Sequence, residues 1–210
     1  MTQVTRIKCG GTNCFCLENN GSAILIDTSR TSYRDKILNA CRGKNVRLII
    51  LTHGHIDHIQ NAAVLSKELN APIAIHRADY EMLCSKTVEP LMADTISGRV
   101  LLAMIQGELK EGEDQLFETD VFLADGDTLE QYGIEAAVIG LPGHTKGSIG
   151  VIVADSDIFV GDALMNIIYP AKSLMYGNRQ DMFASAARIS GYKNATVHFG
   201  HGRSVPNRVW

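Results

Sequence analysis

The sequence predicts an α+β protein built as a four-layer αββα sandwich with a helical insertion around residues 78–114, and two observations lead to this fold class. Short apolar segments typical of strands dominate both ends of the chain, and turn residues separate them. In each half a helical pattern precedes a strand, and a histidine follows shortly after the end of that strand. Two similar halves of this kind are expected to pack sheet against sheet, with helices outside.

The first half opens with an expected β-meander. Its predicted strands are residues 3–8, 13–18, 22–27, 46–51 and 72–75. Asn19-Asn20-Gly21 is a strong hairpin signal between two of them. Ser32 and Asp35 have the spacing of a capping box, which predicts a helix after the meander. Asp57 is a candidate N-cap for a second helix, on which His58 would face inward.

Residues 78–114 have a helical pattern between two strand regions, so they form an insertion in the sandwich. Val100 and Met104 belong to a broad apolar face. Long excursions beside a site often act as lids, and this face would then set substrate choice. A helix packed on the core, or a contact between two copies of the chain, explains the pattern equally well. The sequence leaves the oligomeric state open, a homodimer included.

The second half is rich in strands again. Its predicted strands are residues 121–124, 128–131, 134–141, 148–153, 158–160 and 195–199, with a helix at 181–190. A potential metal ligand follows three of these strands, namely His144, Asp162 and His201. His198 lies within a strand and is interpreted as structural.

The segment LTHGHIDHIQN at residues 51–61 carries the strongest chemical signal. His53, His55, Asp57 and His58 follow the apolar strand 46–51 directly. Ligands gather outside the carboxyl ends of strands in open sheets, and imidazole with carboxylate suits zinc, iron or manganese. An extended loop followed by a helix can present these side chains to two adjacent metals.

Two metals need more ligands than this segment has, and the strand-end residues of the second half supply them. We assign His53, His55 and His144 to one metal and Asp57, His58 and His201 to the other, with Asp162 as the bridging carboxylate. The expected cofactors are two divalent ions, zinc first, with iron or manganese as alternatives.

Composition narrows the class of protein. The chain has 210 residues, 45% of them apolar, and is expected to form one domain over 1–210. A net charge of −3 without basic runs argues against nucleic acid as a partner, so the expected partner is a small-molecule substrate. Five cysteines without a C-x-x-C pair indicate reduced thiols. No apolar run reaches membrane-spanning length, so a cytoplasmic location is expected.

Four motifs together resemble the metallo-β-lactamase superfamily over nearly the whole chain. They are H-x-H-x-D-H at 53–58, P-G-H-T at 142–145, G-D at 161–162 and G-H-G at 200–202. The resemblance implies the αββα fold and the metal assignments above. An aspartate at position 162 resembles the glyoxalase II, lactonase and phosphodiesterase-like members, whereas true β-lactamases usually carry cysteine or serine there.

Two branches of the superfamily fit the sequence less well. Glyoxalase II proper has a helical C-terminal region that helps to bind glutathione, but only nine residues follow His201 here. The ribonuclease members usually add a basic arm, which this chain lacks.

The expected function is hydrolysis of an ester, thioester or lactone by a hydroxide that bridges the two metals. Asp57 is expected to help move a proton to the leaving group. Tyr169 or Tyr176 is a candidate hydrogen-bond donor to substrate, and His76 a candidate substrate or supporting residue. The alternative is a mononuclear iron oxidoreductase resembling persulfide dioxygenase. A phosphodiesterase and a catalytically idle binding module rank below both.

Overall fold

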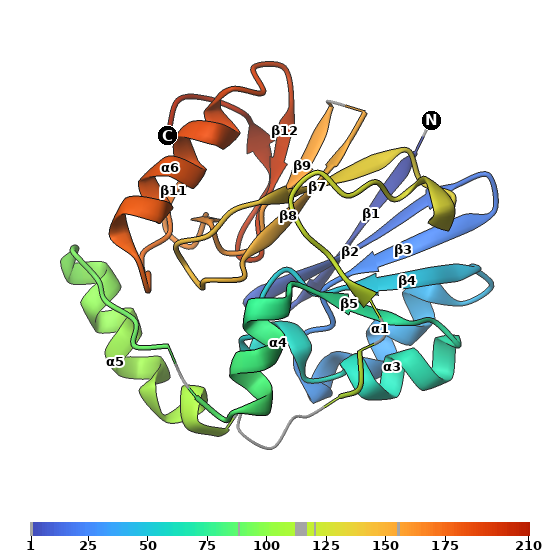
Figure 1. Ribbon diagram of the computed structural model, residues 1–210, viewed down its shortest axis with the longest axis horizontal. Coiled ribbons are helices and arrows are strands. Elements are labelled where there is room, and N and C mark those ends of the chain that lie inside the picture. The colour runs from blue at the N-terminus through green and yellow to red at the C-terminus, as the bar shows by residue number, and fades with distance from the viewer. Residues whose placement is uncertain (1, 88, 112–116, 120, 155) are drawn as a thin grey trace.

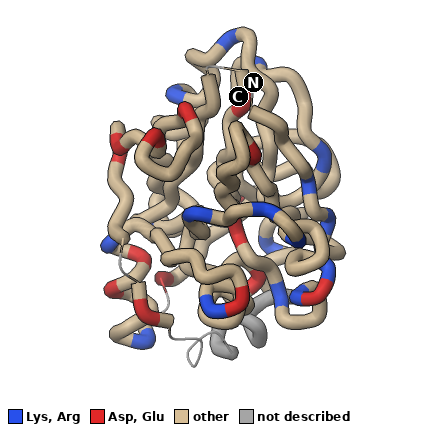
Figure 2. The backbone as a smooth tube through the Cα atoms, turned by 90° about the vertical axis from the view of Figure 1, so that its right-hand side faces the viewer, with Lys and Arg blue, Asp and Glu red and all other residues tan. Residues whose placement is uncertain are grey.

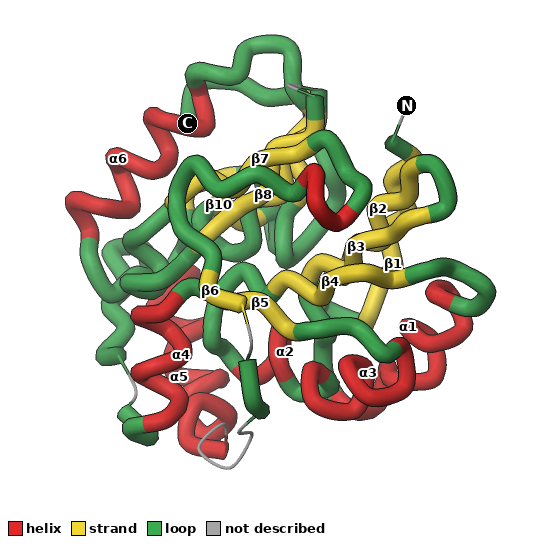
Figure 3. The backbone as a smooth tube through the Cα atoms, turned by 45° about the vertical axis from the view of Figure 1, so that its right-hand side comes forward, coloured by secondary structure: helices red, strands yellow, loops and turns green. Residues whose placement is uncertain are grey.

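Two β-sheets face each other in the computed structural model, and helices cover both outer faces (Figure 1). The structure describes residues 1–210 except 1, 88, 112–116, 120 and 155. Figure 3 shows the strands between α6 on one side and α1 and α3 on the other. The predicted αββα sandwich is therefore confirmed.

The first sheet is built from the strands of the N-terminal half and from β6 (Val121–Phe122), a strand that the sequence analysis had placed in the second half. Its order is β1 (Gln3–Cys9), β2 (Thr12–Asn19), β3 (Ser22–Ile26), β4 (Val46–Ile50), β5 (Ile73–Ile75) and β6. The first three strands are antiparallel, and β3 to β6 are parallel to one another. The parallel strands β4 and β5 thus end at the same edge of the sheet.

The second sheet comes from the C-terminal half. Its order is β13 (Val205–Pro206), β12 (Thr196–His198), β9 (Asp157–Phe159), β8 (Ile149–Val153) and β7 (Ala136–Gly140). A separate two-stranded ribbon pairs β10 (Leu164–Met165) with β11 (Ala171–Lys172). No sequence pattern had indicated β10, β11 or β13, which are each two residues long.

Helices fill the outer layers and the insertion. They are α1 (Arg34–Cys41), α2 (Ile56–Ile59), α3 (Ala62–Leu69), α4 (Arg77–Cys84), α5 (Ile96–Glu111) and α6 (Arg179–Ser190). The short 3-10 helices η1 (Thr31–Tyr33) and η3 (Glu130–Tyr132) lie in connections. In Figure 1, α5 lies outside the two sheets, beyond α4.

Three apolar clusters hold the four layers together. Because side chains alternate along a strand, Leu25 packs toward the helices of the first half while Ile24 packs toward the second sheet. On β8, Val151 packs between the sheets and Ile152 faces the cluster that includes α6. Strands in the middle of each sheet, such as β3 and β8, are thus buried on both faces, which explains their near-continuous apolar runs.

Three local predictions were wrong. Residues 128–131 form no strand. Thr128 makes one isolated bridge, and the chain then turns through η3 to Gly133, whose φ is +85°. The Ser32 and Asp35 capping box is absent because η1 precedes α1, whose N-cap is Tyr33 without a side-chain cap bond.

The third wrong prediction concerned Asp57, which does not cap a helix. The N-cap is His55, and Asp57 lies inside the first turn of α2. This helix stops after one turn, and α3 starts at Ala62. The side-chain amide of Asn61, between the two helices, donates to the carbonyls of Thr28, Ser29 and Arg30. That connection holds the histidine loop against the end of β3.

The distribution of charged residues and the state of the cysteines agree with the expectations from composition. Basic and acidic residues are interspersed along the chain (Figure 2). All five cysteines are free thiols, and only Cys84 is exposed. Within the described part of the chain, no helix is both long and apolar enough to cross a bilayer.

Candidate metal centre and adjoining pocket

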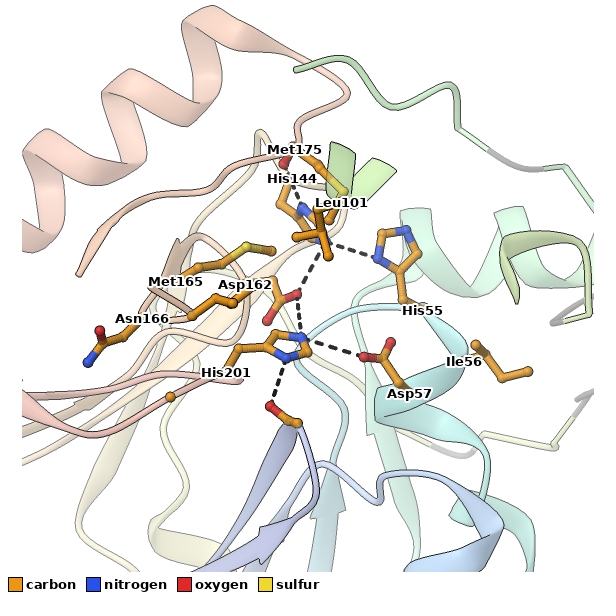
Figure 4. A pocket seen from close by; sticks show the side chains of 13 residues that line it. His55, Ile56, Asp57, Leu101, His144, Asp162, Met165, Asn166, Met175 and His201 are labelled. Carbon is orange, nitrogen blue, oxygen red and sulfur yellow. Dashed lines mark hydrogen bonds and ion pairs between the residues drawn. The ribbon is translucent and has the colours of Figure 1, made fainter. Parts of the chain in front are cut away.

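Seven polar side chains meet at one edge of the sandwich, where strands from both sheets end. His53, His55, Asp57 and His58 follow β4, while His144 follows β7, Asp162 follows β9 and His201 follows β12. Figure 4 shows five of them, from four of these segments, pointing toward one another. The structure thus brings together every residue that the sequence assigned to the metal centre.

Three histidines form the first group. The inward nitrogens of His53, His55 and His144 all lie within 4.8 Å of one another. His144 Nε2 is 2.9 Å from His55 Nδ1. These residues could hold one metal ion.

Asp57, His58 and His201 form the second group, again with ligand atoms within 4.8 Å of one another. The Nε2 atoms of His58 and His201 are 3.4 Å apart, and His201 Nε2 is 3.5 Å from Asp57 Oδ2. This group could hold a second ion next to the first.

Asp162 lies between the two groups. Its Oδ2 is 3.7 Å from Nε2 of His144, in the first group, and 3.1 Å from Nε2 of His201, in the second. Oδ1 is 3.5 Å from Nε2 of His58. One carboxylate therefore contacts members of both groups, as a bridging ligand would.

The outer nitrogens of three histidines have fixed partners. His58 Nδ1 lies 2.8 Å from Asp27 Oδ2. His144 Nδ1 lies 2.8 Å from the Met175 carbonyl oxygen, and His201 Nδ1 lies 3.0 Å from the Gly11 carbonyl oxygen. All three partners are acceptors, so each Nδ1–H donates and each Nε2 keeps its lone pair directed into the cluster. This is the usual support of a metal-binding imidazole.

The donor set fits divalent metals. Among the described residues, His53 Nε2 and Asp162 Oδ1 are the buried side-chain atoms that lack a hydrogen-bond partner, and both belong to the cluster. Buried polar atoms without a partner are costly. A cation would give both atoms a partner. It would also offset the repulsion between His55 Nδ1 and His144 Nε2 when both nitrogens carry lone pairs, since these atoms face each other. Nitrogen and carboxylate donors suit zinc, iron and manganese alike.

The electrostatics of the cluster are consistent with this fit. Burial, with the neighbouring His144, lowers the pKa of His55 to about 3, which keeps it neutral and able to bind a metal. Burial alone would lower the pKa of His58, but three surrounding carboxylates raise it to about 10. Burial would likewise raise the pKa of Asp162, yet His201 and His58 hold it well below its usual range. Metal binding at this site would displace protons from the second group.

Glycine at position 200 is a steric requirement of the site. A Cβ there would lie 2.3 Å from Asp162 Oδ1 and 2.8 Å from His58 Cε1. The backbone before His201 therefore approaches the Asp162 carboxylate more closely than any other residue type allows.

Sequence reasoning missed two buried aspartates that support the cluster. Asp27 accepts from the backbone N–H and the hydroxyl of Thr52 as well as from His58. It adopts a left-handed conformation, with φ of +60°. It is the last residue of the strand predicted at 22–27 and directly follows β3 in the structure, a strand-end position like the one that singled out Asp162.

The other missed aspartate, Asp79 in the first turn of α4, joins the two loops that carry the first group. Its carboxylate accepts from Gly54 N at 2.8 Å, Thr145 Oγ1 at 2.8 Å and Gly147 N at 2.6 Å. Gly54 lies between His53 and His55, and Thr145 follows His144. No sequence pattern indicated this contact, because two of the three donors are backbone groups.

A pocket of about 350 Å³ opens beside the cluster. His55, Asp57, His144, Asp162 and His201 form its polar wall. The remaining wall is mainly apolar and includes Ile56, Leu101, Met165, Ile167 and Met175. A small ligand can thus place a polar group at the cluster and an apolar group against the opposite wall.

The insertion reaches this pocket through Leu101 of α5. Val100 and Met104, which the sequence analysis had placed toward the substrate, are 56% and 75% exposed and do not line it. The predicted face of α5 was therefore wrong, and Leu101 on another face contacts the pocket instead. That this segment sets substrate choice stays a prediction.

None of the other three candidate substrate residues lines the pocket. His76 is the N-cap of α4 and accepts from Ala78 N. Tyr169 and Tyr176 line a neighbouring cavity, where the Tyr176 hydroxyl donates to Asp94 at 2.5 Å. His198 contacts Ser204 and Asp157 outside the cluster, in agreement with a structural role.

Comparison with known proteins extends the likeness beyond the motifs. A model of the metallo-beta-lactamase superfamily matches residues 7–201. An uncharacterized protein of Mycobacterium bovis is 30% identical over 92% of this chain and 87% of its own. A hydroxyacylglutathione hydrolase of Xanthomonas campestris is 24% identical over 91% of this chain, which covers 61% of that enzyme.

A solved structure shares the fold. The crystal structure of the B3 metallo-beta-lactamase BLEG-1 has a TM-score of 0.71, with 97% of this chain and 93% of that chain covered. At 19% identity this likeness concerns the fold alone.

Proposed function

The chain belongs to the metallo-beta-lactamase superfamily, and from that premise we propose that it is a metal-dependent hydrolase of esters, thioesters or lactones. Members of one fold can carry out different reactions, so the proposal depends on the site itself. The observation that carries it is the position of Asp162 between two groups of three ligands.

His53, His55 and His144 would hold one ion, Asp57, His58 and His201 the other, and Asp162 would contact both. Two adjacent metal ions supply, when bound, a nucleophilic hydroxide and polarisation of the attacked carbonyl. The protein orients these ligands through the outer contacts of the histidines and through the carboxylates of Asp27 and Asp79.

Asp57 is the proposed proton carrier. It lines the pocket, and its Oδ2 is 3.5 Å from His201 Nε2. Burial would raise its pKa, but the nearby His58 and His201 lower it, so the carboxylate is ionised at neutral pH. It can accept a proton as water attacks and release that proton to the departing oxygen or sulfur.

The apolar wall is proposed to bind the acyl portion of the substrate. Leu101, Met165 and Met175 offer flexible or branched apolar surface opposite the cluster. The relative named hydroxyacylglutathione hydrolase makes a thioester the first substrate class to test.

The test combines metal analysis with a substrate screen. Protein purified without added metal should contain two metal ions per chain and hydrolyse at least one ester, thioester or lactone, with activity lost on chelation and restored by metal. Asp162→Asn provides the matched inactive control. Hydrolysis that persists without metal would overturn the proposal.

A mononuclear iron oxidoreductase is the second candidate, because the first group of three histidines is complete without the second group. One iron per chain, oxygen uptake with glutathione persulfide, and no hydrolysis of any compound in the screen would favour this candidate over the hydrolase.

A further inference from the structure

A second cavity, here called the basic groove, adjoins the pocket beside the metal cluster. It measures about 450 Å³ and is lined by Arg6, Lys8, Gly10, Gly11, Asn166, Ile167, Ile168, Gly202 and Arg203. Gly11, Asn166, Ile167 and Gly202 also line the pocket. The two cavities thus share a wall, and a ligand of moderate length can occupy both.

The basic groove is positively charged. Arg6, Lys8 and Arg203 are exposed and contribute three cationic side chains, and no aspartate or glutamate is among the described residues that line it. Arg6 and Lys8 lie two residues apart on β1, so both face away from the buried Ile7. This local charge contrasts with the net charge of −3 for the chain.

The guanidinium of Arg6 is oriented by the protein. Its Nε donates to Asn13 Oδ1 at 2.8 Å, which leaves its terminal nitrogens for a ligand. Burial and the nearby Arg203 both lower the pKa of Arg6. An anion between the two guanidinium groups would relieve this repulsion.

The basic groove is also fixed relative to the metal cluster. Asn13 Nδ2 donates to the carbonyls of Phe199 and Gly202, on either side of His201, and Gly11 accepts from His201 Nδ1. The shared wall is tight, because a Cβ at Gly202, where φ is +101°, would lie 1.9 Å from the Asn166 carbonyl oxygen. The same contacts that place His201 therefore place the basic groove.

We propose that the basic groove binds an anionic group, phosphate or carboxylate, on the part of the substrate that extends away from the metal cluster. The scissile carbonyl would lie at the cluster, the apolar acyl part against Leu101 and Met175, and the anionic end between Lys8 and Arg203. This inference rests on the proposed function, because it takes the cluster as the place where the substrate is cleaved.

Thioethers test binding without turnover, since they lack the carbonyl that would be hydrolysed. We suggest three probes that carry the same propyl group. S-propyl pantetheine is neutral, S-propyl 4′-phosphopantetheine carries a phosphate, and S-propylglutathione carries carboxylates. The measurement is the ratio of the dissociation constant of the neutral probe to that of each anionic probe, by calorimetry on the metal-loaded protein.

At least one anionic probe is expected to bind about tenfold more tightly than the neutral probe, which corresponds to about 1.4 kcal/mol, because two or three exposed ion pairs each contribute little. The preference should decrease as ionic strength rises. The anionic probe with the larger preference identifies phosphate or carboxylate as the recognised group.

The variant Lys8→Gln/Arg203→Gln should lose this preference. A matched control, Arg47→Gln/Lys67→Gln, also removes one arginine and one lysine, from exposed positions on β4 and α3, and should keep it. Equal affinity of the wild type for all three probes, or an unchanged preference in the groove variant, would overturn the inference.

The outcomes also separate this inference from the proposed function. A charge preference that depends on Lys8 and Arg203, in a protein that hydrolyses no ester, thioester or lactone, supports the basic groove and counts against the hydrolase. Thioester hydrolysis without any charge preference supports the hydrolase and counts against the basic groove.

Discussion

Replacing Asp79 with asparagine tests whether the first group of ligands depends on a single buried carboxylate. Asp79 is fully buried and accepts three hydrogen bonds from the two loops that carry His53, His55 and His144. Asparagine has nearly the same shape but only one acceptor oxygen. Either orientation of the amide therefore places its NH₂ group against a backbone N–H, of Gly54 or of Gly147.

The cost can be worked out from these contacts. The orientation that keeps Gly54 and Thr145 leaves Gly147 N–H buried without an acceptor, which costs about 1–3 kcal/mol. The two retained bonds lose their charge assistance, at roughly 1 kcal/mol each. Burial raises the pKa of Asp79, so removing the charge returns part of this energy. The net destabilisation is expected to be about 2–4 kcal/mol.

The assay is urea unfolding of the metal-free protein, which excludes stabilisation by bound metal. Thermal unfolding should show a decrease of about 5–15 °C for a chain of this length. Zinc titration should show weaker binding, by about 10–100-fold, because the supporting shell is altered. Asp35→Asn, at an exposed position on α1, is the control and should change stability by less than about 0.5 kcal/mol.

A loss below about 1 kcal/mol together with unchanged zinc affinity would refute the reasoning. It would show that the two loops keep their positions without the carboxylate of Asp79.

Three further predictions concern separate parts of the molecule. Asp162→Asn should reduce the metal content, and it should reduce turnover by about 100-fold or more, because a neutral amide bridges two cations poorly. Elemental analysis and activity measurements on the same sample check this. Leu101→Ala should raise KM for a long apolar acyl substrate by about tenfold, whereas Met104→Asp, on the exposed face of α5, should leave the relative rates of different substrates unchanged. Hydrogen bonds from Arg188 and the Gly140 backbone lower the pKa of Asp125 below its ordinary value of 3.8, so Asp125→Asn should cost up to about 1 kcal/mol at pH 7 for this exposed pair. That difference should decrease as the pH falls below 3.8 and through the lowered pKa of the wild-type carboxyl, and urea unfolding at a series of pH values measures it.

The architecture and the convergence of the ligands could be inferred from sequence for a physical reason. Apolar strands and their end residues form a local pattern, and strands of a sandwich deliver their end residues to a common edge. His144 and Asp162 were identifiable in this way even though each is a single residue. Asp27 satisfies the same criterion and could have been included.

Other features depend on contacts that no local pattern records. Asp79 acts through backbone groups of residues 25 and 68 positions away. The strand expected at 128–131 had suitable residues but almost no partner, apart from one bridge at Thr128. The helical periodicity of α5 did not reveal whether Leu101 or Met104 would face the pocket, because both belong to apolar stripes of similar strength.

Each group of three ligands draws on both halves of the chain, since His53 and His55 meet His144 while Asp57 and His58 meet His201. Each bound ion would therefore act as a cross-link between the two sheets, formed only after the sheets have docked. Contacts that form after the folding transition state change the unfolding rate and leave the folding rate almost unaltered. Metal binding is thus expected to lower the unfolding rate without raising the folding rate. The lifetime of the folded chain would therefore increase with the metal concentration.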